Sequence, residues 1–438
     1  MLNKFPVAII GGGPVGLAAA AHLIKRNMKF VLIEQGASVG ASIKEWGHVR
    51  MFSPWKYNID QAAEALLLAN GWAAPDAEQL PTGNQLVDEY LSPFARLPEV
   101  EPHLVMNSTV VGIHRYGIDK VKTAGRESFP FEITMESKDG QVSQLLASAV
   151  IDATGTWRSP NPAGASGSSA IGELEVQDQV TYGIPNATAQ RNRYAGKRVA
   201  VIGSGHSAIN SILELSKLQI EEPAASIIWV LRKGAVEDTY GGGAADALPA
   251  RGQLGLDISD LIQMGRIEVV TAFRTQKIEK QAEKLKLIGM RNHATVELEA
   301  IDELVVNTGA RPDFAYLREV RVQADPALEC VPALADLIDP NVHSCGTVRP
   351  HGEAELRQPE MNFYIVGSKS YGRAPTFLMA TGYEQVRSLV AALAGDWDAA
   401  RRVELNLPET GVCSVSNIPA VNSTIAVGSS SGTSSCCG

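Results

Sequence analysis

Three glycines near the N-terminus have the spacing of a phosphate-binding turn. Gly11, Gly13 and Gly16 form a G-x-G-x-x-G pattern, and Pro14 lies inside it. In such a turn the first glycine permits a tight bend, the second lets the backbone approach a pyrophosphate, and the third lets the following helix pack closely on a sheet. The free N–H groups at the start of that helix would bind the phosphates. The pattern therefore predicts a dinucleotide site.

A carboxylate stands where such a site needs one. Glu34 follows the apolar residues 30–33 and lies about 20 residues beyond the glycine turn. A carboxylate there accepts hydrogen bonds from the hydroxyl groups of an adenosine ribose. A glycine-rich turn without a ligand is the alternative, and the complete order of strand, turn, helix, strand and acid argues against it.

The same arrangement occurs a second time. After the apolar residues 198–202, a G-x-G-x-x-A pattern predicts a second nucleotide site formed by Gly203, Gly205, His206, Ser207 and Ala208. The next apolar run, residues 226–231, ends at Arg232 and Lys233 instead of an acid. Cationic side chains at this place favour a 2′-phosphate, so NADPH is expected here in preference to NADH. Two solvated charges at a strand end remain the alternative, for Lys233 in particular.

Two further apolar runs end in a Thr-Gly pair. The first ends at Thr154 and Gly155, and the second ends at Thr308 and Gly309. Small residues at a strand end let the chain turn close to a bound cofactor. Two glycine turns and two Thr-Gly ends indicate an internal duplication. The expected fold class is α/β, with two Rossmann-like dinucleotide-binding domains of three-layer ββα type and a disordered C-terminal tail.

The bulk composition excludes several functional classes. The chain has 438 residues, 45% of them hydrophobic and 20% charged, which is typical of a globular protein and long enough for more than one domain. Its net charge of −9 and its lack of a basic cluster predict no nucleic-acid partner and no membrane surface. The first apolar strand begins almost at Met1, so a cytoplasmic protein without a signal peptide is expected. Five cysteines, an odd and small number, favour reduced thiols.

Composition also suggests where the domains begin and end. Residues 1–165 and 325–400 are expected to form the first domain in two parts, and residues 190–320 the second domain. Residues 156–190 are rich in Ser, Gly, Pro and Asn, so they are interpreted as a linker. Residues 401–438 are expected to be a flexible tail that contains cysteines.

Two stretches outside the glycine turns are candidates to border the ligands. Residues 40–55 are rich in aromatic side chains that are costly to expose, and Trp46 among them is expected to lie along the bound dinucleotide. Residues 241–255 are rich in glycine, which is consistent with a mobile loop over a substrate and equally with an ordinary connector.

A polar loop follows the last apolar strand, which ends at Gly367. Lys369, Tyr371 and Arg373 lie in this loop and are the candidate catalytic residues, one of which would contact the cofactor or an anionic substrate. Charge on a loop surface is the equally weighted alternative. A helix is expected to begin at Thr376, and its N-terminus would stabilise negative charge on a neighbouring cofactor.

Three cysteines in the tail are candidate metal ligands. Cys436 and Cys437 are adjacent, and Cys413 lies in the same tail. Thiolates are soft ligands that suit soft metal or metalloid ions. A tail whose cysteines have no role is the alternative.

These motifs together resemble those of flavoproteins with two dinucleotide-binding domains, over residues 5–395. That superfamily includes pyridine-nucleotide disulfide reductases and flavin-containing monooxygenases. The resemblance implies that FAD binds at the first glycine turn with Glu34 and that NADPH binds at the second with Arg232. Residues 203–208 and the aromatic stretch look most like the monooxygenase-like branch. Residues 370–378 look like flavoproteins found beside arsenic-resistance genes.

The sequence departs from these relatives at three places. It has no C-x-x-C or C-x4-C pair of the kind that disulfide reductases use. Residues 182–185, Tyr-Gly-Ile-Pro, stand where monooxygenases carry F-x-G-x-x-x-H. The usual Gly-Asp that binds the flavin ribityl chain reads Gly367-Ser368. These departures leave the final electron acceptor open.

The leading interpretation is a monooxygenase-like oxidoreductase that uses FAD and NADPH, with O2 and a small-molecule substrate as partners. The second is a thiol- or metalloid-directed flavin reductase that uses the tail cysteines. The third is a non-catalytic flavoprotein that binds metalloid. A homodimer is compatible with each of them.

Overall fold

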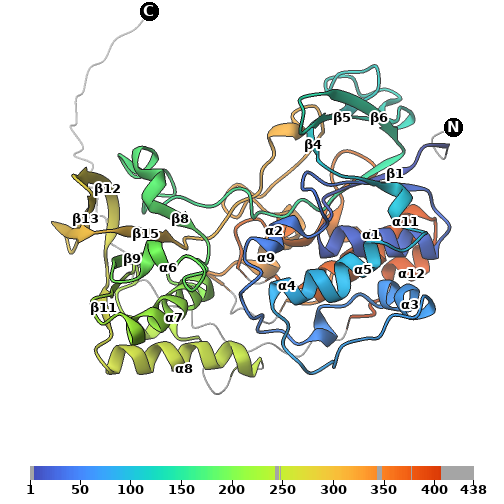
Figure 1. Cartoon of the computed structure of the whole chain (residues 1–438). Coiled ribbons are helices and arrows are strands. Elements are labelled where there is room, and N and C mark those ends of the chain that lie inside the picture. Colours follow the sequence, from blue (N-terminus) through green and yellow to red (C-terminus); the bar gives the residue numbers. More distant parts are fainter. Residues whose placement is uncertain (1–3, 242–245, 247, 343–347, 376, 406–438) are drawn as a thin grey trace, which may run out of the picture.

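The chain forms two lobes, each built on its own parallel sheet (Figure 1). The computed structural model describes residues 4–241, 246, 248–342, 348–375 and 377–405. The predictions made for Thr376, Cys413, Cys436 and Cys437 therefore fall outside the described residues. Every helix within the described part of the chain is too short or too polar to cross a lipid bilayer.

The first parallel sheet has the strand order β16-β7-β1-β2-β3. Its strands are β1 (Val7–Ile10), β2 (Phe30–Ile33), β3 (Leu104–Val105), β7 (Ala149–Asp152) and β16 (Phe363–Ile365). The central strand β1 is buried on both faces, which explains its unbroken apolar sequence. Because β16 lies near the C-terminal end of the described chain, the residues that complete the first domain follow the second domain in the sequence.

The second parallel sheet has the equivalent order, β11-β10-β9-β15-β8. Its strands are β8 (Val180–Tyr182), β9 (Arg198–Ile202), β10 (Ser226–Val230), β11 (Ile267–Val270) and β15 (Glu303–Val306). Strand β9 lies between β10 and β15, just as β1 lies between β2 and β7. The predicted α/β fold with two Rossmann-like domains is confirmed.

Each parallel sheet is accompanied by a three-stranded antiparallel sheet. In the first domain the sheet consists of β4 (Ser108–Arg115), β5 (Phe131–Ser137) and β6 (Val142–Ala147). In the second it consists of β12 (Arg274–Gln281), β13 (Lys284–Arg291) and β14 (Ala294–Ile301). In the sequence, β4–β6 lie between β3 and β7, and β12–β14 lie between β11 and β15. The antiparallel sheets therefore also belong to the duplicated pattern.

The helices of the described residues are α1 (Pro14–Lys25), α2 (Ala41–Lys44), α3 (Gln61–Ala69), α4 (Gly83–Gln85), α5 (Ser92–Ala95), α6 (Arg191–Tyr194), α7 (His206–Glu221), α8 (Pro249–Gln263), α9 (Ala335–Ile338), α10 (Glu353–Leu356), α11 (Met379–Leu393) and α12 (Trp397–Arg401). Helices α1, α7 and α8 contact the parallel sheets, and most of the other helices of the described residues pack on helices. Residues Leu86–Leu91 continue α4 as a π-helical turn.

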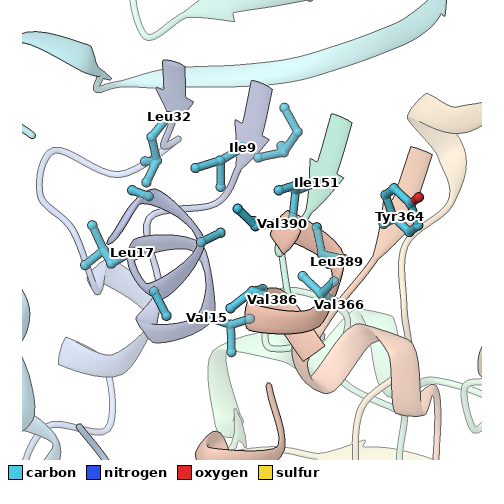
Figure 2. Packing of buried hydrophobic residues seen from close by; sticks show 14 of the residues in the cluster. Ile9, Val15, Leu17, Leu32, Ile151, Tyr364, Val366, Val386, Leu389 and Val390 are labelled. Atoms are coloured by element: carbon cyan, nitrogen blue, oxygen red, sulfur yellow. The ribbon is translucent and has the colours of Figure 1, made fainter. Parts of the chain in front are cut away.

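Helices α1 and α11 pack side by side on one face of the first sheet (Figure 2). Ile9 and Ile151 point from the strands toward the helices, where Val15 of α1 and Val386 of α11 meet them. The alanine run of α1 is almost wholly buried, and its small side chains let the two helices approach. The C-terminal helix α11 is therefore part of the core that supports the first glycine turn.

Three local predictions need correction. The stretch interpreted as a linker contains β8, whose three residues pair with β15 in the second sheet. The glycine-rich stretch becomes helix from Pro249 onward, and Gly255 lies so close to Tyr240 that a Cβ would stand 1.9 Å from its carbonyl oxygen. Helix α11 begins at Met379, with Leu378 as its N-cap. The domain boundaries themselves stay predictions.

A buried ion-pair cluster joins the first antiparallel sheet to the returning chain. Arg115 on β4 donates to the Glu360 carboxylate at 2.9 Å, and Arg126 donates to both of its oxygens at 3.0–3.1 Å. Burial alone would raise the pKa of Glu360, but the hydrogen bonds from the two arginines outweigh it, so the pKa is lowered. Glu360 therefore stays ionised and holds the two segments together.

We predict that Glu360→Gln lowers the free energy of unfolding by about 3–5 kcal/mol, because the two buried guanidinium groups lose their counter-ion. The pKa of Glu360 is lowered in the folded state. Its contribution to the free energy of unfolding should therefore be complete above the pKa that Glu360 has in the unfolded chain, and should disappear as the pH falls through the lowered pKa of the folded state. Urea titrations across this pH range measure both effects. The control is Glu78→Gln, which removes an exposed partner of Lys56. Equal stability of the two variants would contradict the prediction.

Candidate functional site

A cleft of about 520 Å³ runs along the carboxyl ends of the first parallel sheet. In open α/β sheets this edge is where ligands bind. Eight of the residues predicted from the sequence line it, namely Gly11, Gly13, Pro14, Glu34, Trp46, Thr154, Gly155 and Gly367. The predicted residues thus converge on one cleft although they come from distant parts of the chain.

The geometry of the first turn explains each of its glycines. Gly11 has a φ of +105°, and a Cβ there would stand 2.7 Å from the carbonyl oxygen of Ala153. A Cβ on Gly16 would stand 2.0 Å from the carbonyl oxygen of Gly11. A Cβ on Gly13 would meet no protein atom within 4 Å. Gly11 and Gly16 are therefore required by packing, whereas the space beside Gly13 is left free at a residue that lines the cleft.

The start of α1 fits a phosphate. Gly13 is the N-cap of this helix and supplies no side-chain hydrogen bond to the first N–H groups. Those groups carry the positive end of the helix dipole, which favours an anion. The open space at Gly13 and the uncapped helix end together fit the diphosphate of a dinucleotide cofactor such as FAD.

Glu34 is held rigidly at the end of β2. Its Oε2 accepts a hydrogen bond from the backbone N–H of Gly12 at 2.6 Å, and its Oε1 accepts one from Gly36 at 2.7 Å. The residue is only 8% exposed, yet it lines the cleft. An ionised carboxylate has about four acceptor sites, so two remain for the hydroxyl groups of a ribose.

The second glycine turn repeats this construction. A Cβ on Gly203 would stand 2.2 Å from the carbonyl oxygen of Asn307, and a Cβ on Gly205 would meet nothing within 4 Å. Gly205 is the N-cap of α7 and again supplies no side-chain cap. The structure thus provides a second uncapped helix end with free space for a phosphate.

Arg232 and Lys233 follow directly after β10. Arg232 is exposed and donates one hydrogen bond to the carbonyl oxygen of Ala165 at 2.9 Å. Lys233 is half-buried and donates to the carbonyl oxygen of Asp238 at 2.5 Å. Arg232 has further N–H groups that could reach a 2′-phosphate, because a guanidinium has five.

His206 is the first residue of α7, and its ring lies 5.7 Å from the ring of Phe52 in the first domain. Burial lowers the pKa of His206, and the nearby charge of Arg251 lowers it further, so the imidazole is neutral near pH 7. Because Phe52 lines the cleft, this contact joins the second glycine turn to the first site.

The other residues predicted near the second turn pack against protein groups or bond to them. Ser207 lies in the first turn of α7, and Ala208 is buried there. The Thr308 hydroxyl donates to the carbonyl oxygen of Asn161 at 2.7 Å. Gly309 has a φ of +93° and lies against the same asparagine. Thr308 and Gly309 therefore fix the segment that connects the second domain back to the first.

Polar contacts join the aromatic stretch, residues 40–55, to the segment that follows β7. The Glu45 carboxylate accepts a hydrogen bond from Trp157 Nε1 at 2.7 Å and forms an ion pair with Arg158 at 2.7 Å. His48 Nε2 lies 3.1 Å from the carbonyl oxygen of Pro185, just beyond β8. Trp157 and Arg158 also line the cleft, and the sequence analysis missed both.

Lys369, Tyr371 and Arg373 are absent from the described residues that line the cleft. Lys369 is buried behind it and forms an ion pair with Asp152. Tyr371 is buried against His351 and Phe377, and this burial raises its pKa.

Arg373 is exposed, 4.0 Å from the Glu329 carboxylate. From the same region, Ser368, Phe377 and Met379 do line the cleft. The catalytic roles assigned to Lys369, Tyr371 and Arg373 stay predictions.

Asp152 and Tyr316, which bond to Lys369, are not among the residues predicted from the sequence. Asp152 could have been predicted from the sequence, because an acid at the end of a wholly apolar strand needs a buried partner. Tyr316 carried no such signal, since it lies in a short 3-10 helix, Ala315–Leu317, with no motif around it.

The cysteine chemistry is limited within the described residues. Cys330 is buried and free, and burial raises its pKa to about 12, so it is not a thiolate near neutral pH. No group of three or more His, Cys, Asp or Glu residues within the described part of the chain could hold a metal ion.

Two glycine turns on duplicated parallel sheets are the architecture of a two-domain dinucleotide-binding protein. The chain belongs to the pyridine nucleotide-disulphide oxidoreductase family, whose model matches residues 8–331. Members of this family bind FAD and NAD(P)H and include both reductases and monooxygenases.

Similar proteins fall into several groups. Ferredoxin–NADP reductase 1 of Bacillus velezensis is 25% identical over 335 residues, which cover 73% of this chain and 79% of the reductase. The solved structure of bacillithiol disulfide reductase from Bacillus cereus has a TM-score of 0.67 and 20% identity, and covers 89% of this chain and 99% of that one. The ornithine N-hydroxylase of a Kutzneria species has a TM-score of 0.58 and 16% identity, with coverage of 89% and 99%. The two structures show a shared fold.

The contrast between two glycines gives a direct test of the first site. We predict that Gly13→Ala leaves the unfolding midpoint of the FAD-free protein unchanged but prevents FAD retention, because its Cβ enters the space for the phosphate and meets no protein atom. Gly11→Ala should instead destabilise the FAD-free protein, since its Cβ meets the Ala153 carbonyl. Thermal unfolding and the flavin content after gel filtration measure both. Full FAD retention by Gly13→Ala would show that the cofactor does not bind at this turn.

Proposed function

We propose that the protein is an FAD- and NADPH-dependent oxidoreductase of monooxygenase-like type, in which electrons pass from NADPH to FAD and then to O2 and a small-molecule substrate. One observation carries this proposal. Each domain has a glycine turn with room for a phosphate, and the contact between Phe52 and His206 places the second turn beside the cleft of the first domain.

Different residues of the chain would bind different parts of the two cofactors. Glu34 would bind the adenosine ribose of FAD, and the start of α1 its diphosphate. Arg232 would bind the 2′-phosphate of NADPH. His206, at the start of α7, would help to hold the nicotinamide nucleotide, and its neutral imidazole adds no positive charge there. Bound FAD would supply the hydride-accepting chemistry, while the protein supplies orientation and excludes water.

The cysteines argue against a redox-active protein disulfide beside the flavin. The sequence has no C-x-x-C or C-x4-C pair, and Cys330 is buried with a raised pKa. Electrons would therefore leave by way of a diffusible acceptor. O2 is the acceptor that the monooxygenase-like motifs favour.

A second candidate acceptor is a small one-electron carrier protein. The likeness to ferredoxin–NADP reductase 1, which covers 79% of that protein, favours it. The metalloid-directed reductase and the metalloid-binding flavoprotein depend on Cys413, Cys436 and Cys437, which lie outside the described residues. These two functions, the likeness to arsenic-resistance flavoproteins, the cytoplasmic location and a homodimer stay predictions.

Anaerobic mixing with NADPH tests the proposal. The visible absorbance of bound FAD should bleach within the turnover time, and admission of O2 should restore it. Reoxidation by O2 that incorporates oxygen into a small nucleophilic substrate supports the monooxygenase-like reaction. Rapid reoxidation by a ferredoxin with slow reoxidation by O2 would support the second candidate. A flavin that NADPH does not bleach would contradict both.

We predict that Arg232→Ala raises the KM for NADPH by about 10-fold or more, since a charge-assisted phosphate contact is worth roughly 1.5–3 kcal/mol. The KM for NADH should change little, because NADH lacks the 2′-phosphate. Steady-state assays with both nucleotides measure the ratio. Lys233→Ala is the matched comparison, as its ammonium already bonds to the Asp238 carbonyl. Parallel losses with NADPH and NADH in Arg232→Ala would remove the 2′-phosphate role.

A further inference from the structure

Lys369 is the most deeply buried cation beside the cleft. Its side chain is 0% exposed, and its ammonium donates three hydrogen bonds. The acceptors are Asp152 Oδ2 at 2.8 Å, the Tyr316 hydroxyl at 2.6 Å and Thr154 Oγ1 at 3.3 Å. All three of its N–H groups are therefore used, and none remains for a substrate.

Asp152 completes the group from the other side. Its Oδ2 accepts from Lys369 and from the Tyr316 hydroxyl at 2.7 Å, and its Oδ1 accepts from Thr154 Oγ1 at 2.8 Å. Burial, followed by the charge of Asp152, raises the pKa of Tyr316 well above 10, so the phenol keeps the proton that it donates. The cluster of Lys369, Asp152, Tyr316 and Thr154, here called the Lys369 cluster, contains one cation and one anion.

The four residues form two layers. Tyr316 and Thr154 line the cleft, whereas Lys369 and Asp152 lie behind them. The ion pair can reach a molecule in the cleft only through the two hydroxyl-bearing side chains in front of it.

The cluster also marks where the chain crosses between the domains. Thr154 follows β7 of the first sheet, and Tyr316 follows β15 of the second sheet. The segments that follow these two strands pair with each other through a bridge between Pro160 and Ala310. Lys369 arrives from a third segment, after β16. One ammonium group thus holds together three segments that are far apart in the sequence.

We propose that Lys369 is a positioning residue, which together with Asp152 fixes Tyr316 and Thr154 as the part of the cleft wall against which the flavin cofactor binds. This inference rests on the proposed function, because it takes FAD as the occupant of the cleft. It changes the role expected for Lys369 from contact with a substrate to support of a binding surface.

The test compares FAD affinity in four forms of the protein: wild type, Lys369→Met, Asp152→Asn and the double variant. Each single substitution leaves one buried charge without its partner and lets the wall shift, so each should raise the Kd for FAD by about 10-fold or more. The double variant removes both charges and should recover most of the loss. The shape of the visible flavin band, which reports the surroundings of the ring, should change and recover in parallel.

Two further variants keep the test decisive. Lys56→Met, which removes an exposed lysine paired with Glu78, is the matched control and should bind FAD like the wild type. Tyr316→Phe keeps the ring and loses the hydroxyl, so it should weaken FAD binding even if Lys369→Met does not fold.

Opposite outcomes would overturn the proposal. If Lys369 acted by direct attraction of the FAD phosphates, Asp152→Asn would tighten binding and the double variant would stay as weak as Lys369→Met. Unchanged affinity in Lys369→Met, or in Tyr316→Phe, would remove the positioning role. A wild-type protein that binds no FAD at all would instead refute the proposed function, and this inference with it.

Discussion

The fold depends on a close approach of two backbone segments that occurs once in each domain. In the first domain the glycine turn passes so near the end of β7 that a Cβ on Gly11 would stand 2.7 Å from the Ala153 carbonyl oxygen. In the second, a Cβ on Gly203 would stand 2.2 Å from the carbonyl oxygen of Asn307, which follows β15. No side chain fits at either contact. The same contact brings the helix N-terminus and the strand ends to one edge of the sheet, where phosphates bind.

The first domain needs further connections because its chain is interrupted by the second domain. Helix α11 and β16 complete it only at the end, where they pack against α1 and β7. Two buried charge clusters join these late segments to the early ones, Glu360 with its two arginines and Lys369 with Asp152. Such pairs add little net stability compared with apolar packing, but removing one partner is costly. Their geometric effect is to set where the returning chain lies beside the cleft.

Much of the fold, and the set of eight predicted residues that line one cleft, could be predicted because they depend on short-range patterns. The strands β1 and β9 lead directly into glycine turns, the mainly apolar strands β2 and β10 follow the next helices, and Glu34 lies at the distance that the motif requires. What failed depends on long-range contacts. The three-residue strand β8 sits in a polar stretch and exists because β15 offers it a partner. Glycines before and within α8 made its start hard to predict from the sequence. One of them, Gly255, is needed for close packing on Tyr240. The partners of Lys369 come from segments 53 and 217 residues away.

The central claim is that hydride passes from NADPH bound in the second domain to FAD bound in the first. The most direct measurement is the anaerobic rate of flavin bleaching with NADPH, compared with NADPH that carries deuterium at the transferred position of the nicotinamide. We expect bleaching to be slower with the deuterated nucleotide, because breakage of that bond reduces the flavin. Bleaching at the same rate with both nucleotides, or no bleaching at all, would contradict the account.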